Sequence, residues 1–137
     1  MFRHILVAVD GSPQSGKTIP IGVDLAQRYG STVTVMHARE YERYEGSDID
    51  LGPPITAEAL VDEVVKTFRE AGVEATGVIR RVHPGETPEQ IIEVAKTSAA
   101  ELIVMGTRGM SEFKSLLLGG VANKVVHHAS CPVLLVR

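Results

Sequence analysis

Short apolar runs alternate along this chain with longer segments of helical periodicity, and this alternation limits the fold more than any other feature. The apolar runs cover residues 4–9, 32–37, 76–82, 102–105 and 133–136. Helical patterns cover residues 13–29, 56–71, 88–99 and 121–129. Four of the runs are apolar enough for burial on both faces, which is typical of parallel strands covered by helices. The sequence therefore predicts an α/β fold, a three-layer domain around a five-stranded parallel sheet.

Size, charge and cysteine content narrow the class of protein. The 137 residues carry a formal net charge of -3, which gives no electrostatic reason to bind nucleic acid or an anionic membrane. Cys131 is the single cysteine, so no internal disulfide can form, and the apolar run before Asp10 is too short for a secretion signal. We expect one domain spanning residues 1–137, in the cytoplasm, with neither nucleic acid nor membrane as a partner.

Candidate binding residues follow the predicted strands. In open parallel sheets, ligands bind outside the carboxyl ends of the strands, where the strand order reverses. Asp10 follows the first strand, Ala38 follows the second, and Gly106 ends the fourth. A carboxylate at such a position is suited to accept ribose hydroxyls or to contact a metal, so Asp10 is a candidate for either role.

A glycine cluster after the fourth strand is a candidate phosphate site. Two residues separate Gly106 from Gly109, and nine residues separate Gly109 from Gly119, which Gly120 follows. Glycines allow the backbone to approach a ligand closely, and a helix start adds unsatisfied N–H donors. Arg108, between the first two glycines, either contacts phosphate or lies in solvent.

The stretch GSPQSGKT, residues 11–18, offers a competing phosphate site because it matches the P-loop pattern. Lys17 and Thr18 would then hold phosphate and Mg²⁺ in an NTPase. The alternative is a helix start, with Ser12 as the cap, in which the match is accidental. Pro20 complicates a continuous helix, and a kink between residues 16 and 22 would accommodate it.

Several stretches of this chain resemble the universal stress protein family. They are ILVAVDGS at the start, VMHA, GETPEQII, LIVMGTRG with its nine-residue gap to LGGV, and HASCPVLLV. The resemblance implies a Rossmann-like fold with strand order 3-2-1-4-5, ATP or AMP as the ligand, and Mg²⁺ as an ion that ATP could bring. It also implies a homodimer paired through the last strand, together with an unidentified protein partner.

The resemblance also assigns the nucleotide-binding positions. Gly120 stands where nucleotide-binding members have Ser or Thr, so one hydroxyl donor to phosphate is missing, worth about 1.5–3 kcal/mol. Asp10 would lie beside the nucleoside and the backbone of Ala38 would meet adenine. The full set of expected contacts is Ala8, Val9, Asp10, Ala38, Met105, Gly106, Arg108, Gly109, Gly119, Gly120, Val121 and Ala122.

Three functions therefore remain open from the sequence. The first is a stress-response protein whose bound ATP or AMP tunes its dimer or partner contacts, with weak ATP hydrolysis at most, because no residue is placed as a general base. The second is a dimeric interaction protein that binds no nucleotide, suggested by Gly120. The third is a P-loop NTPase that uses residues 11–18.

The remaining candidates have structural explanations. Residues 39–54 form a polar, turn-rich connection, which we interpret as a lid or partner surface, or as a disordered insertion. His127 and His128 fit the end of a helix, where the dipole favours them, and no metal site is predicted. Cys131 is expected to be a small buried residue rather than a reactive thiol.

Overall fold

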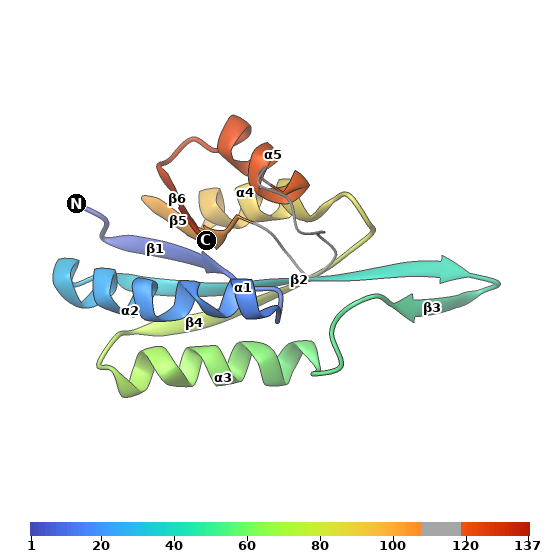
Figure 1. The fold of residues 1–137 in the computed structure, drawn as a ribbon, viewed down its shortest axis with the longest axis horizontal. Helices are drawn as coiled ribbons and strands as arrows, with labels where there is room; N and C mark the ends of the chain where they lie inside the picture. The colour runs from blue at the N-terminus through green and yellow to red at the C-terminus, as the bar shows by residue number, and fades with distance from the viewer. Residues whose placement is uncertain (108–118) are drawn as a thin grey trace.

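The computed structural model describes residues 1–107 and 119–137, which form one mixed sheet and five helices among them (Figure 1). The strands are β1 (His4–Ala8), β2 (Thr32–Tyr44), β3 (Ser47–Asp50), β4 (Ala75–Val82), β5 (Leu102–Gly106) and β6 (Val133–Val136). The helices are α1 (Pro13–Gly16), α2 (Thr18–Tyr29), α3 (Ala57–Glu70), α4 (Thr87–Thr97) and α5 (Gly120–His128).

The sheet confirms the predicted α/β class and adds one strand. Parallel pairings join β4 to β2, β2 to β1, β1 to β5 and β5 to β6. These are the five predicted strands, and their neighbours follow the expected order. The sheet has a sixth strand, however, because β3 pairs antiparallel with the outer end of β2. The prediction of a purely parallel, five-stranded sheet is therefore corrected to a mostly parallel one.

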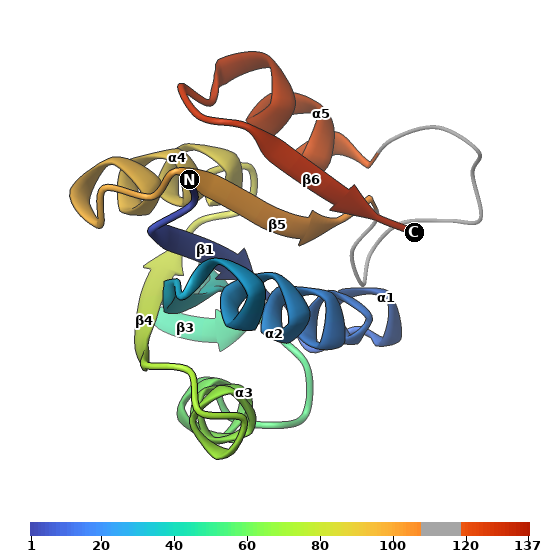
Figure 2. The ribbon, with the colours of Figure 1, turned by 90° about the vertical axis from the view of Figure 1, so that its left-hand side faces the viewer.

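Helices cover both faces of the sheet, and each face has its own apolar core (Figures 1 and 2). Alternation along β1 divides them, since Ile5 and Val7 face α2 and α3 while Leu6 faces α4 and α5. Phe68 of α3 is fully buried in the first core, and Val125 of α5 is fully buried in the second. Burial on both faces explains why the central strands are almost continuously apolar.

The first predicted helix is divided into α1 and α2, as the position of Pro20 suggested. The break falls at Lys17, so Pro20 becomes the third residue of a new helix instead of an interior one. Proline is tolerated in the first turn because those N–H groups have no partner within the helix. The kink expected between residues 16 and 22 is thus confirmed.

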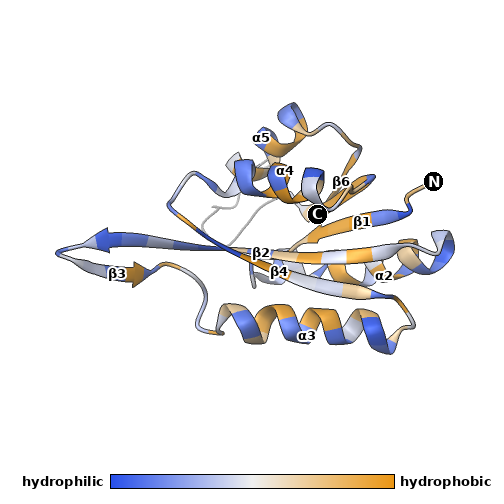
Figure 3. Ribbon diagram, turned by 180° about the vertical axis from the view of Figure 1, so that it is seen from behind, coloured by the Kyte–Doolittle hydropathy of each residue, from blue (hydrophilic) through white to orange (hydrophobic). Residues whose placement is uncertain are grey.

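Residues 39–54 are not a plain connection but largely a β-hairpin. β2 continues to Tyr44, and its outer residues pair with β3. Glu45 and Gly46 turn the chain with φ of 48° and 79°, the positive values of a tight hairpin turn. Figure 3 shows the outer half of β2 as hydrophilic, which explains why an apolar strand pattern predicted only residues 32–37. The disordered-insertion interpretation is wrong.

Candidate functional site

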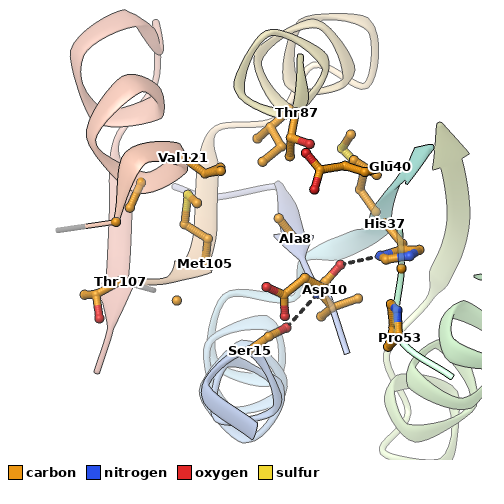
Figure 4. Close-up of a pocket in the computed structure, with 18 of the residues that line it drawn as sticks. Ala8, Asp10, Ser15, His37, Glu40, Pro53, Thr87, Met105, Thr107 and Val121 are labelled. Carbon is orange, nitrogen blue, oxygen red and sulfur yellow. Dashed lines mark hydrogen bonds between the residues drawn. The ribbon is translucent and has the colours of Figure 1, made fainter. Parts of the chain in front are cut away.

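A pocket lies at the carboxyl ends of β1 and β5, where the chain connections leave the sheet on opposite faces (Figure 4). It has a volume of about 190 Å³. The switch point of a doubly wound sheet is the place where ligands of such folds bind. The position of the pocket therefore agrees with the expectation from strand order.

Most of the predicted binding residues line this pocket. Gly120 does not line it, and Arg108 and Gly109 lie outside the described residues. The predicted residues that the structure brings together here are Ala8, Val9, Asp10, Ala38, Met105, Gly106, Gly119, Val121 and Ala122. The residues that sequence reasoning missed are Ser15, Met36, His37, Glu40, Leu51, Gly52, Pro53, Thr87, Ile91 and Thr107.

The middle of the pocket is apolar. Ala8 lies at its centre in Figure 4, with Met105 on the β5 side. Met36 and Ile91 contribute from β2 and α4, and both are buried. Small and flexible apolar side chains between a sheet and a helix leave a slot that suits a flat, weakly polar group such as a nucleobase.

One end of the pocket is formed by the start of α5. The Gly119 N–H donates to the Thr107 carbonyl oxygen at 2.7 Å, which joins the end of β5 to the helix start. Gly119 caps α5 without a side-chain hydrogen bond. A Cβ placed on Gly120 would meet no atom of residues 1–107 or 119–137 within 4 Å, so this part of the chain accepts a side chain there. A helix N-terminus that lines the end of a pocket is suited to an anionic group.

Asp10 is held in a turn at the end of β1. Its carboxylate accepts from the Ser12 N–H at 2.9 Å, and its own N–H donates to the Ser15 hydroxyl at 2.9 Å. These bonds fix the aspartate at the pocket edge, beside the slot. The sequence predicted Asp10 at this edge of the sheet because it directly follows an apolar strand, and Asp10 lines the pocket there.

The P-loop alternative is not supported by the local geometry. Ser12 caps α1, accepting from the Ser15 N–H at 3.0 Å, and its carbonyl oxygen accepts from the Gly16 N–H at 3.0 Å. Thr18 is fully buried and donates its hydroxyl to the Ser15 carbonyl oxygen, whereas Lys17 is exposed. The N–H groups and the hydroxyl that a P-loop would offer to phosphate and Mg²⁺ are therefore used within the helix start.

The segment returning from the hairpin forms a wall of the pocket, which fits the lid interpretation of residues 39–54, although none of its residues was named as a site residue. Leu51, Gly52 and Pro53 line the pocket, and a Cβ on Gly11 would come within 2.9 Å of the Pro53 ring. This close approach joins the hairpin return to the turn after β1. Gly11 has a φ of 85°, which glycine adopts readily.

Arg39 holds this wall in place. Its guanidinium pairs with both oxygens of Asp50, each at 2.9 Å, and donates to the carbonyl oxygens of Pro53 at 2.8 Å and Ile55 at 3.0 Å. Gly52 packs so closely on the guanidinium that a Cβ there would collide with it. The bidentate bond also lowers the pKa of the Asp50 carboxyl. Arg39 is therefore a positioning residue for the pocket wall.

His37 lies beneath the same wall. Its Nδ1 is 2.9 Å from the Val9 carbonyl oxygen, which identifies Nδ1 as the protonated nitrogen of a neutral ring. Its Nε2 is buried and has no hydrogen-bond partner among the residues that the structure describes. Burial lowers the pKa of His37, more than the Val9 hydrogen bond raises it. A neutral imidazole is the consequence.

Metal, thiol and membrane functions receive no structural support. Within residues 1–107 and 119–137, no group of three or more His, Cys, Asp or Glu side chains is placed to hold a metal ion. Cys131 is partly buried, and burial raises the pKa of its thiol, which disfavours the reactive thiolate. None of the described helices is long and apolar enough to cross a membrane.

The sequence matches a known family along its whole length. Residues 1–137 match the family model of the universal stress protein family. A universal stress protein of Thermus aquaticus, encoded in the QAH/OAS sulfhydrylase 3' region, is 39% identical with complete coverage of both chains. The universal stress protein YxiE of Bacillus subtilis is 31% identical, again with complete coverage of both.

Solved structures share the fold. The hypothetical protein MJ0577 aligns with a TM-score of 0.81 at 20% identity, covering 99% of this chain and 96% of that one. A universal stress protein in complex with cAMP aligns with a TM-score of 0.73 at 21% identity, covering 99% and 97%. One from Archaeoglobus fulgidus in complex with dAMP aligns with a TM-score of 0.66 at 22% identity, covering 100% and 98%.

Proposed function

This chain belongs to the universal stress protein family, and we propose that it binds an adenine nucleotide, ATP or AMP, in the pocket at the carboxyl ends of β1 and β5. The observation that carries this proposal is the apolar slot that ends at the start of a helix. Two structural neighbours hold cAMP and dAMP, which supports an adenine nucleotide as the ligand class.

The two ends of the pocket suggest how the ligand is oriented. Phosphate fits the end near Gly106, where Val121 and Ala122 of the first α5 turn line the pocket and the dipole of the helix favours an anion. The base then lies in the apolar slot near Ala38, and Asp10 is placed to accept ribose hydroxyls. Mg²⁺ would arrive with ATP, because this ion is typically held by the phosphate oxygens of the nucleotide together with a protein carboxylate.

Binding, rather than turnover, is the proposed activity. Asp10 already accepts from the Ser12 N–H, and His37 is on β2, across β1 from the proposed phosphate end at α5, so neither is arranged as a base for water attack on a terminal phosphate. We propose that occupancy instead alters contacts with another copy of this chain or with a partner protein. The hairpin is suited to such signalling, since its return segment is a wall of the pocket.

A titration with matched variants tests this function. The purified protein is denatured to identify any released nucleotide, and ATP and AMP are then titrated by calorimetry. Ala8→Leu would fill the slot and should weaken binding at least about tenfold through steric conflict. Lys17→Ala is the control, because this exposed residue does not line the pocket. Binding lost only in the lysine variant would return the site to residues 11–18.

A gain of affinity provides a second test. According to the family resemblance, nucleotide-binding members carry a hydroxyl at the position of Gly120. Gly120→Ser restores this hydroxyl, and the open space around Gly120 accepts the side chain. One added hydrogen bond to a charged group should tighten ATP binding about tenfold or more. Gly16→Ser is the matched control, since Gly16 also has open space but ends α1, whereas Gly120 begins α5. Absence of binding in wild type and in Gly120→Ser, with the fold intact, would favour the interaction protein.

A further inference from the structure

Glu40 places a second carboxylate in the pocket, away from Asp10. It follows Ala38 by two residues on β2, so both side chains are on the same face of the sheet. Glu40 lines the pocket and is partly buried. In Figure 4 its side chain extends from β2 toward Thr87, at the first turn of α4.

The carboxylate of Glu40 has no hydrogen bond or ion pair with any residue in the described part of the chain. Its backbone is engaged, since the Glu40 carbonyl oxygen accepts from the Leu51 N–H at 2.9 Å. Its neighbour Arg39, in contrast, is fully paired with Asp50 and two carbonyl oxygens. A partly buried carboxylate is stabilised when a donor reaches it, so the pocket offers an acceptor that a ligand can use.

The sheet order decides which part of a nucleotide reaches this acceptor. β2 and β5 lie on opposite sides of β1, so Glu40 on β2 lies across the pocket from Gly106 at the end of β5. Phosphate at the Glu40 end would meet a like charge, whereas the opposite end is lined by the N-terminal turn of α5, whose dipole favours an anion. The base therefore occupies the end that contains Glu40, Ala38 and Ile91.

We propose that Glu40 is a specificity residue that accepts a hydrogen bond from the exocyclic amino group of adenine. This assignment rests on the proposed nucleotide binding. A base that carries a keto oxygen in place of the amino group would set two acceptors against each other. Glu40 thereby favours a 6-aminopurine over a 6-oxopurine in the same position.

A pair of ligands that differ by one group isolates this contact. AMP is compared with purine riboside 5'-monophosphate, in which hydrogen replaces the 6-amino group and the rest of the nucleotide is unchanged. Wild type should bind AMP about tenfold more tightly, as expected for one charge-assisted hydrogen bond. AMP and purine riboside 5'-monophosphate carry the same phosphate, so removing the charge of Glu40 changes the electrostatic part of both affinities equally. The ratio of the two dissociation constants therefore reports the contact with the 6-amino group alone.

Three variants complete the cycle. Glu40→Leu removes the acceptor and should bring the ratio close to one, while Glu40→Gln keeps a neutral acceptor and should give an intermediate ratio. Glu42→Gln is the control, because this exposed glutamate of β2 does not line the pocket and should leave the ratio as in wild type. Thermal melting of each variant separates a stabilising role at the α4 start from ligand selection.

The outcomes separate the specificity assignment from the function on which it rests. AMP binding in wild type with a ratio of one, or a ratio that Glu40→Leu and Glu40→Gln leave unchanged, would overturn the role of Glu40 and leave nucleotide binding intact. Failure of wild type to bind AMP or ATP would overturn the proposed function and this assignment together. A ratio that falls only in the Glu40 variants supports the assignment.

Discussion

His37 and His4 are the residues through which pH should act on the stability of this protein. Burial lowers the pKa of both from 6.5. The unfolded chain therefore binds protons more readily than the folded chain as pH falls below 6.5. Stability is highest above pH 6.5 and decreases below it, with a slope of up to about 1.4 kcal/mol per pH unit from His37 and a smaller slope from the more exposed His4.

Substitution of His37 tests this pH dependence. Urea unfolding at pH 7.5 and at pH 5 should show a smaller loss in His37→Gln than in wild type, because the amide still donates to Val9 but takes up no proton. His4 accounts for the dependence that remains. His128→Gln, at an exposed position, is the control. Equal losses in wild type and His37→Gln would assign the acid sensitivity elsewhere.

The β2–β3 hairpin depends on the contacts that Arg39 makes with the segment that follows it. Arg39→Lys replaces a planar group that serves Asp50, Pro53 and Ile55 by a single ammonium, which cannot reach all of them. We expect a loss of about 1–3 kcal/mol in unfolding free energy. Faster hydrogen exchange in residues 50–55 should accompany it, because that segment loses its anchor.

The control for this substitution is Arg43→Lys in the same strand. Arg43 is exposed and its nearest contact with Asp48 is 3.6 Å, so its loss should cost less than about 0.5 kcal/mol. Low pH should destabilise the hairpin in the same way as Arg39→Lys. Arg39 lowers the pKa of Asp50 from 3.8, and the ion pair is lost as pH falls through that lowered value. Unchanged exchange in Arg39→Lys would show that the hairpin return is held by other contacts.

The same hairpin marks the limit of what the sequence could predict about the elements. The central strands were predictable because burial on both faces requires apolar residues, and the break at Lys17 followed from Pro20. The outer part of β2 is exposed and carries no apolar alternation, so it looked like a loop. Positive φ at Glu45 also gave no signal, because glutamate is not a usual turn residue there.

The residues of the candidate site, which come from all parts of the molecule, also divide into those that the sequence could predict and those that it could not. Asp10, Gly106 and Gly119 were predictable because topology brings strand ends and helix starts to one edge of a parallel sheet, whereas Met105 was assigned from the family resemblance. Glu40 and Pro53 were not, since their presence in the pocket depends on how the hairpin returns across it. Membership of the pocket is thus set partly by strand order and partly by long-range packing that no local pattern records.

The free edge of β6 leads to a proposal about assembly. Among the described residues, β6 pairs with β5 alone, and Leu134 on it is 37% exposed. The Pro132 carbonyl oxygen accepts from the Ile103 N–H of β5, and the Val136 carbonyl oxygen accepts from the Thr107 N–H. Because successive residues of a strand direct their backbone groups to opposite sides, those of Val133 and Leu135 point outward. An apolar edge with open donors and acceptors favours pairing with another strand. We propose that two copies of this chain pair through β6.

Charge at this edge should separate the two copies. Leu134→Lys brings like charges together across the pair, so sedimentation velocity should show a dimer for wild type and a monomer for the variant. Ile49→Lys is the matched control, since Ile49 is 45% exposed on β3 of the hairpin and should leave the dimer intact. Equal melting temperatures would show that the fold survives. A dimer that resists Leu134→Lys would place the contact on another face, and the exposed hairpin would be the next surface to test.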